Sequence, residues 1–176
     1  CFQITKLPYF ARTVEEILTY VVRDMTAPEG GFYSAEDADS EGEEGKFYVW
    51  TEAEVNQILG GKDGKLFNEI YRLQKEGNFQ DEATHQKTGA NIPHLRKSLD
   101  DHAQERKLDP EEFRKKINAL KTKLFTTREK RIHPQKDDKV LTDWNGLMIS
   151  TFAQSAKALN NDEYLKVAQE AADFCL

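Results

Sequence analysis

The chain has 176 residues, of which 38% are hydrophobic and 32% are charged. This length suffices for one domain with its own core, or for part of a larger domain. The formal net charge of −6 at pH 7 argues against a nucleic-acid-binding protein, which is usually basic. No apolar run approaches the ~20 residues that a membrane-spanning helix needs. We therefore expect a soluble protein without a nucleic-acid or membrane partner.

Both ends of the sequence look cut from a longer protein. The chain opens with Cys1 rather than Met, and it stops at Leu176 inside an apolar periodic run. The two cysteines, Cys1 and Cys175, form neither a metal-binding pattern nor a disulfide framework. This cysteine usage favours a reducing compartment, so we expect a cytoplasmic location. The expected organisation is a single partial domain over residues 1–176.

The first predicted element is an amphipathic helix at about residues 8–25, where apolar side chains recur every three or four positions. Aromatic runs at 32–34 and 46–50 flank an acidic segment that contains glycine, which predicts a β-hairpin with a long loop. Residues 51–54, Thr-Glu-Ala-Glu, fit a capping box, so a helix is expected to begin there and to end at residues 60–61, Gly-Gly.

Five further helices are predicted downstream from capping and first-turn residues. Asp63 and Asp109 are expected to cap two of them, and Pro93 suits the first turn of a third. The other two are expected to begin at Thr142 or Asp143 and at Asp162. Residues 75–92 lack periodicity and are expected to form a loop. Short links between the last helices predict antiparallel helix pairs. The predicted fold class is therefore mainly α, with about seven helices and one β-hairpin near residues 31–50.

The first candidate site is the acidic segment after Phe32. Carboxylates this close in sequence repel one another unless they are solvated, neutralised or partly protonated. A calcium-binding EF-hand loop that starts at Asp37 would need an acid eleven residues later, where Tyr48 stands. A solvated hairpin tip accounts for residues 43–44, Glu-Glu. The candidate catalytic acids are Glu36, Asp37 and Asp39.

A second candidate site lies just before the helix predicted at Thr142. Paired acids beside a lysine and a tryptophan are a plausible sugar-binding arrangement, because aromatic faces stack on pyranose rings while acids and amides bond to hydroxyl groups. The same residues also suit structural roles as helix caps, as charges at a helix N-terminus or as a core tryptophan. Both interpretations stay open. The candidate catalytic acids here are Asp137 and Asp138, and the predicted substrate-binding residues are Tyr33, Trp50, Asn78, Lys139, Trp144 and Asn145.

Histidine spacing gives no sign of a metal site. His85, His94, His102 and His133 do not share a zinc-binding pattern, and His102 is expected to have a half-buried packing role. No glycine-rich phosphate loop or nucleophile elbow is present. We therefore predict no metal and no cofactor.

Several motifs, taken in order along the chain, resemble the spermatogenesis-associated protein 20 / YyaL-like family. They are Gly-Gly-Phe-Tyr-Ser-Ala-Glu-Asp-Ala-Asp-Ser at 30–40, Gly-Lys-Phe-Tyr-Val-Trp-Thr at 45–51, Glu-Gly-Asn-Phe at 76–79, Asn-Ile-Pro-His at 91–94 and Asp-Asp-Lys-Val-Leu-Thr-Asp-Trp-Asn-Gly at 137–146. The resemblance runs from about residue 8 to the end of the chain.

The resemblance implies a parent protein with an N-terminal thioredoxin-like domain and an (α/α)6 toroid, similar to N-acylglucosamine 2-epimerases and six-hairpin glycosidases. This chain would be a central section of that toroid. The covalently linked thioredoxin-like domain that the resemblance implies would lie outside this sequence, so no redox chemistry is assigned to Cys1 or Cys175. The toroid further implies a sugar-type cavity and a small-molecule carbohydrate as ligand.

Two classes of function are open, and a third hypothesis is that the acidic hairpin only braces neighbouring helices. In the first class the parent acts as a sugar epimerase or glycoside hydrolase, and hydrolysis would need two carboxylates about 5–10 Å apart. These would come from the two candidate sites, whereas an epimerase would need a base such as His94 or His133. The alternative is a non-catalytic protein- or sugar-binding module attached to the thioredoxin-like domain. Carboxylates that face one cavity beside Trp144 or Trp50 would favour the first class, and carboxylates that point apart would favour the second.

Overall fold

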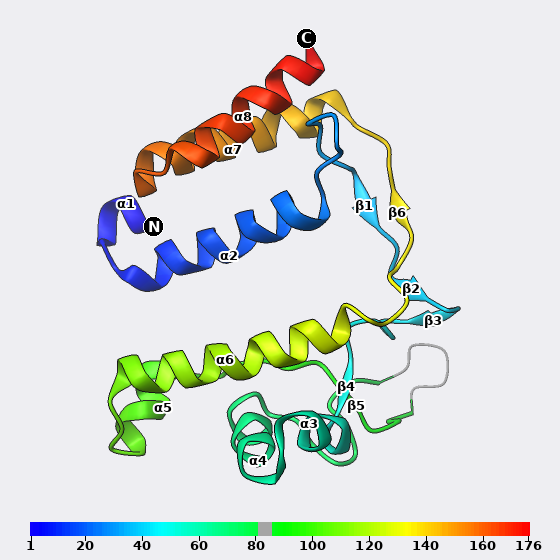
Figure 1. The fold of residues 1–176 in the computed structure, drawn as a ribbon, viewed down its shortest axis with the longest axis vertical. Coiled ribbons are helices and arrows are strands. Elements are labelled where there is room, and N and C mark those ends of the chain that lie inside the picture. The colour runs from blue at the N-terminus through cyan, green and yellow to red at the C-terminus, as the bar shows by residue number, and fades with distance from the viewer. Residues whose placement is uncertain (81–85) are drawn as a thin grey trace. The chain divides into compact units, whose positions relative to one another are not determined.

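The computed structural model describes residues 1–80 and 86–176, and the described chain is mainly helical with small antiparallel strand pairs (Figure 1). It divides into two compact units. Unit 1 is built from residues 1–37 and 135–176, and unit 2 is built within residues 38–134. The predicted mainly α fold class is confirmed.

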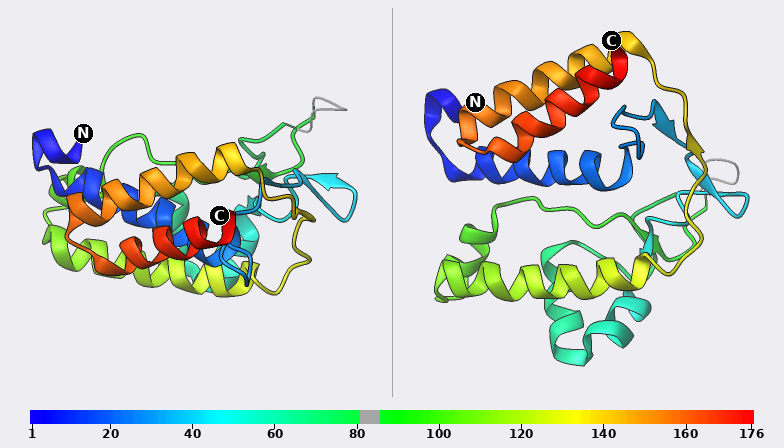
Figure 2. Two further views of the ribbon diagram at one scale, coloured as in Figure 1. Left: turned by 90° about the horizontal axis from the view of Figure 1, so that it is seen from above. Right: turned by 45° about the horizontal axis from the view of Figure 1, so that its top comes forward.

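Unit 1 contains four helices. They are α1 (Phe2–Thr5), α2 (Pro8–Asp24), α7 (Thr142–Leu159) and α8 (Asp162–Cys175). Asn160 adopts a left-handed conformation after α7, and the side chain of Asn161 accepts a hydrogen bond from the backbone N–H of Glu163 to cap α8. With only these two residues between them, α7 and α8 lie side by side as an antiparallel pair, as predicted (Figures 1 and 2).

The core of unit 1 lies between α2, α7 and α8. Its centre is the ring of Phe32, which stacks on Phe152 of α7 with a centroid distance of 5.4 Å and an interplanar angle of 6°. The small residues Ala168 and Ala171 are buried on the inner face of α8, so that this helix can approach α7 closely. Leu18 and Val21 of α2 complete the buried cluster.

Unit 2 contains the other four helices of the described chain. They are α3 (Glu52–Leu59), α4 (Gly61–Ile70), α5 (Leu99–Glu105) and α6 (Pro110–Arg128). Two predicted caps are confirmed, because Thr51 accepts a hydrogen bond from the N–H of Glu54 at 3.1 Å and Asp109 accepts one from the N–H of Glu112 at 2.9 Å. Phe113, Ile117, Leu120 and Leu124 line the buried face of α6.

The helix predicted from Pro93 begins later than expected. Ser98 and Asp101 form a capping box, in which each side chain bonds to the backbone N–H of the other, and α5 starts at Leu99. Residues 93–98 lie outside any helix. The capping box fixes the start of the helix, whereas Pro93 is compatible with a helical first turn without requiring one.

The described residues form three short antiparallel strand pairs, of which the first and third below connect distant parts of the chain. The pairs are β1 (Ala35–Glu36) with β6 (Lys136–Asp137), β2 (Asp39–Ser40) with β3 (Glu43–Glu44), and β4 (Trp50–Thr51) with β5 (Ala90–Asn91).

The predicted hairpin is present but shorter than expected. It consists of β2 and β3, joined by Glu41 and Gly42, which both have positive φ angles of 55° and 75° as a tight two-residue hairpin turn requires. The two aromatic runs do not pair with each other. Instead Phe32 bridges to Thr26, and Trp50 pairs with Asn91.

Candidate functional site

The predicted site residues are divided between the two units. Unit 1 contains Tyr33, Glu36, Asp37, Asp137, Asp138, Lys139, Trp144 and Asn145, and unit 2 contains Asp39, Trp50 and Asn78.

The β1–β6 pair brings the two acidic segments of unit 1 together. Its register places Ala35 opposite Asp137 and Glu36 opposite Lys136. The backbone N–H of Asp37 donates to the carbonyl oxygen of Gln135 at 2.7 Å and extends the pairing. Because successive side chains of a strand point to opposite faces, Glu36 and Asp137 lie on opposite faces of this pair. The two acids therefore lie close in the fold without facing one another.

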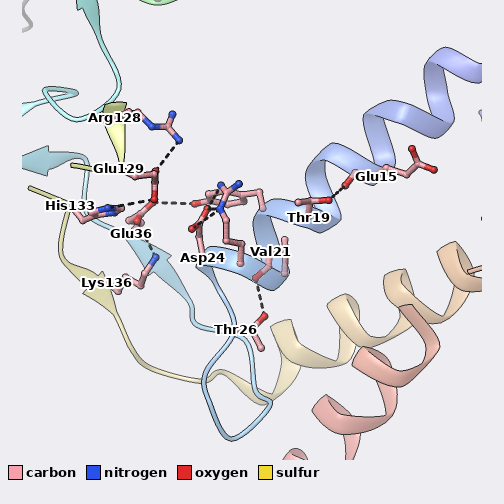
Figure 3. Close-up of polar contacts among 12 residues, drawn as sticks. Glu15, Thr19, Val21, Asp24, Thr26, Glu36, Arg128, Glu129, His133 and Lys136 are labelled. Atoms are coloured by element: carbon pink, nitrogen blue, oxygen red, sulfur yellow. Dashed lines mark hydrogen bonds and ion pairs between the residues drawn. The ribbon is translucent and has the colours of Figure 1, made fainter. Parts of the chain in front are cut away.

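Glu36 is held in a nearly buried ion pair. Its side chain is 10% exposed, and one carboxylate oxygen is 3.1 Å from Nζ of Lys136 (Figure 3). The other oxygen accepts a hydrogen bond of 3.1 Å from the hydroxyl group of Tyr20 on α2. The carboxylate thus joins α2 to the strand pair. No local sequence pattern indicated Tyr20 or Lys136, because each contact depends on residues far away in the chain.

Asp137 is bound to the lysine two residues along. Nζ of Lys139 is 2.9 Å from its carboxylate, and the backbone N–H of Lys139 donates to it at 3.3 Å. These hydrogen bonds lower the pKa of Asp137 below its ordinary value of 3.8, and the same contact raises the pKa of Lys139. A general acid needs a raised pKa, whereas the pKa of Asp137 is lowered, so this carboxyl group does not suit that role. The neighbouring Asp138 is exposed.

Asn145 has a structural position inside unit 1. Its side chain is 2% exposed, and its Oδ1 accepts the backbone N–H of Phe32 at 2.8 Å. Its Nδ2 donates to the carbonyl oxygens of Phe32 and Leu141, each at 3.0 Å. Both N–H donors of the amide are used, so Asn145 fixes the loop of the Gly-Gly-Phe-Tyr motif on the first turn of α7.

Asn145 also lines a cavity of about 250 Å³ in unit 1. Aromatic side chains and the hydroxyl-bearing Ser34 form much of its wall, and Trp144 remains 53% exposed. None of the five candidate catalytic acids is among the residues that line it. The lining residues are Tyr20, Val21, Met25, Phe32, Tyr33, Ser34, Leu141, Trp144, Asn145 and Met148.

In unit 2, Trp50 is buried against an arginine that the sequence did not single out. The guanidinium carbon of Arg131 lies 4.1 Å from the centre of the Trp50 ring. Arg131 also donates to the carbonyl oxygens of Phe47 and Val49, both at 2.8 Å, and to the carboxylate of Glu54 at 2.7 Å. One side chain therefore ties the start of α3 and the aromatic run before it to the end of α6.

Asn78 has a structural hydrogen-bond network of its own. Its side chain accepts the N–H of Ile92 at 2.7 Å and donates to the carbonyl oxygen of Ile92 at 3.1 Å. The fully buried Asn91 accepts the N–H groups of Asn78 and Gln74. Asp39 lies in β2, exposed and opposite Glu44.

His102 is more deeply buried than expected. An N–H group of Arg106 is 3.2 Å from its Nδ1, and burial, together with the charges of Lys97 and Arg106, lowers the pKa of His102.

His85 lies outside the described residues. Within residues 1–80 and 86–176, no group of three or more His, Cys, Asp or Glu side chains is arranged to hold a metal ion. No helix in the described ranges has the length and apolar character to cross a membrane.

The fold defines a mainly helical protein, and comparisons with known proteins give its family. No protein-family model matches the chain. Spermatogenesis-associated protein 20 of Homo sapiens is 36% identical over 190 aligned positions, covering 98% of this chain and 24% of the human protein. The Mus musculus protein of that name gives the same values. An uncharacterized protein of Caenorhabditis elegans is 30% identical over 92% of this chain and 24% of its own length.

The chain therefore belongs to the spermatogenesis-associated protein 20 family, as its motifs indicated. It spans about a quarter of the length of these relatives.

Proposed function

We propose that this chain supplies a binding site for a small carbohydrate to a larger helical protein, and that its acidic residues brace the site without transferring protons. The observation that carries the proposal is the unit 1 cavity beside Trp144. Its wall combines the aromatic rings of Tyr33 and Trp144 with the hydroxyl group of Ser34. Aromatic faces suit the C–H groups of a sugar ring, and hydroxyl groups suit its oxygen atoms.

The size of the cavity favours a single sugar ring. Its volume of about 250 Å³ is below the ~300 Å³ at which pockets for drug-sized ligands begin. An oligosaccharide would need a longer groove. The proposed ligand is therefore a monosaccharide, with or without a substituent that extends into solvent.

Binding without catalysis is favoured over epimerase or hydrolase activity because of the groups around the cavity. Its lining residues in the described chain include no carboxylate and no imidazole. Glu36 and Asp137 each pair with a lysine and lie on opposite faces of the β1–β6 pair. A glycosidase would instead need two carboxylates on either side of one glycosidic bond.

The wider setting is part of the same proposal. The chain would form a central section of an (α/α)6 toroid in a cytoplasmic parent that also carries a thioredoxin-like domain, with a role in carbohydrate metabolism. The α7–α8 pair supports this setting, because antiparallel helix pairs are the repeating unit of such toroids.

Titration with monosaccharides tests the proposal. Plain, N-acetylated and phosphorylated hexoses would be added to the intact chain, and binding would be followed by saturation-transfer NMR and calorimetry. Trp144→Ala should weaken binding by about fivefold or more, since stacking on an aromatic ring contributes on the order of 1 kcal/mol. Leu147→Ala is the matched control, because Leu147 is an exposed apolar residue on the same helix that does not line the cavity.

A second comparison separates binding from catalysis. Asp138→Asn should leave sugar affinity unchanged, because Asp138 is exposed and does not line the cavity. Equal affinity in the native chain and the Trp144→Ala variant would disprove the site. Turnover of a sugar that Asp138→Asn abolishes would instead establish the enzyme hypothesis.

A further inference from the structure

Unit 2 contains a second and larger cavity, which the sugar-binding proposal does not use. Its volume is about 380 Å³, within the ~300–1,000 Å³ range of small-molecule pockets. Part of its lining consists of Trp50, Phe67 of α4 and Tyr71, the residue that follows α4, and the rings of Phe67 and Tyr71 stack at a centroid distance of 4.3 Å. Most of the remaining lining residues belong to α6. The cavity is therefore bordered by flat aromatic surfaces that suit an aromatic ligand.

The α6 wall adds positive charge to this apolar surface. Lys121, Phe125 and Arg128 line the cavity, and their spacing of four and three residues places them on one face of the helix. The two cations are separated by about 10 Å along the helix axis. No Asp or Glu is among the cavity's lining residues in the described chain. The charge of the wall therefore complements an anion.

Arg128 is held in place largely by aromatic rings. Its guanidinium carbon is 5.0 Å from the ring centre of Phe47, 5.2 Å from that of Tyr48 and 5.4 Å from that of Phe125. Its ion pair with Glu129 is 3.7 Å long, beyond hydrogen-bond distance (Figure 3). Its Nε is buried and finds no hydrogen-bond partner within the described ranges. A cation that is partly removed from water and incompletely hydrogen-bonded interacts strongly with an incoming anion.

We propose that this cavity binds a small aromatic carboxylate. The ring of the ligand would lie between Trp50, Phe67 and Tyr71 on one side and Phe125 on the other, and its carboxylate would pair with Arg128 and Lys121. The proposal is independent of the sugar site, because every residue that it uses belongs to unit 2.

The test uses the intact chain, with 2-naphthoate as the probe and the uncharged 2-naphthamide as its matched control. Calorimetry should show that naphthoate binds about tenfold more tightly or better, because a charge-assisted hydrogen bond contributes more than a neutral one. The preference for the carboxylate should fall several-fold in Arg128→Gln and in Lys121→Gln, and it should disappear in the double variant. Lys121→Gln keeps the test decisive if Arg128→Gln destabilises the fold, because Lys121 is exposed on α6.

Lys115→Gln is the control for general loss of positive charge. Lys115 is an exposed residue of α6 that pairs with Glu111 and Glu112 and does not line the cavity, so its replacement should leave the preference intact. NMR should show that naphthoate perturbs the indole N–H of Trp50. Equal affinity for naphthoate and naphthamide, or a perturbation confined to Trp144, would overturn the proposal, and neither result depends on whether the sugar site exists.

Discussion

At the scale of single residues, the two buried asparagines show how polar side chains build this fold. Asn145 binds the N–H and C=O groups of Phe32, and Asn91 binds the backbone of Trp50, Gln74 and Asn78. Each amide satisfies backbone groups that would otherwise be buried without partners. Both residues lie in family motifs, so at these two positions a structural role is sufficient to explain the residue type.

His102 is a residue whose burial makes stability depend on pH. Its pKa is lowered mainly by burial, then by the charges of Lys97 and Arg106, while Glu105 and Glu69 act in the opposite direction. A lowered pKa means that the unfolded chain binds the proton more readily than the folded chain. The contribution of the neutral His102 to the free energy of unfolding is therefore fully present above the ordinary histidine pKa of 6.5, and it decreases as the pH falls below that value.

We predict that His102→Gln makes the free energy of unfolding less dependent on pH below 6.5. Urea unfolding at pH 7.5 and 5.5 should show that the native chain loses free energy of unfolding on acidification and that the variant loses less. His94→Gln, at an exposed position, should retain the native difference. An identical loss in the native chain and in His102→Gln would show that the buried imidazole does not couple protonation to folding.

At the scale of secondary-structure elements, the two lysine–acid pairs beside β6 differ in their surroundings. The Glu36–Lys136 pair spans two strands and is largely shielded, with side chains 10% and 32% exposed. The Asp137–Lys139 pair is local, and its side chains are 39% and 71% exposed. Shielding strengthens the interaction between charges, whereas exposed pairs contribute little.

A double-mutant cycle should separate the two pairs. Glu36→Gln combined with Lys136→Met should give a coupling energy of about 1–2 kcal/mol in urea unfolding, since the two groups are in contact and partly buried. The same cycle at Asp137 and Lys139 should give a coupling close to zero. Equal coupling in both cycles would contradict a special role of Glu36 in joining β1 to β6.

At the scale of the whole molecule, each unit has its own apolar core and closely spaced chain ends. The hydroxyl group of Ser40 donates to the carbonyl oxygen of Ile132 at 2.5 Å, so the two ends of unit 2 meet. In unit 1 the backbone hydrogen bond between Asp37 and Gln135 joins its two segments. Unit 2 is therefore inserted between two chain segments that already contact each other.

This arrangement predicts that the units fold separately. A chain of residues 38–134 should give a helical circular-dichroism spectrum and a cooperative urea transition with a slope of about 1 kcal/mol/M. A second chain, in which a short glycine linker joins Asp37 to Gln135, should retain the Phe32–Phe152 core of unit 1. If neither chain shows a cooperative transition, each core depends on the other unit.

Much of the fold could be predicted from local patterns. The helix at Pro8–Asp24, the buried face of α6 and the caps at Thr51 and Asp109 follow from apolar spacing and from side chains that bond within one turn. The start of α5 was predicted too early, because Pro93 only permits a helix, whereas the capping box at Ser98 fixes one. Strand partners were missed because strands of two residues carry no periodic pattern.

The sequence by itself determined the family, the helical class and the positions of most helices, because motif order, apolar spacing and caps depend on residues close together in the chain. Only the tertiary structure decided what the acids and amides contact. The surroundings of Glu36 include Tyr20 and Lys136, which lie sixteen and a hundred residues away in sequence. Whether a carboxylate is exposed, paired or placed at a cavity depends on such distant partners. A local sequence pattern cannot identify them, because it involves only residues close together in the chain.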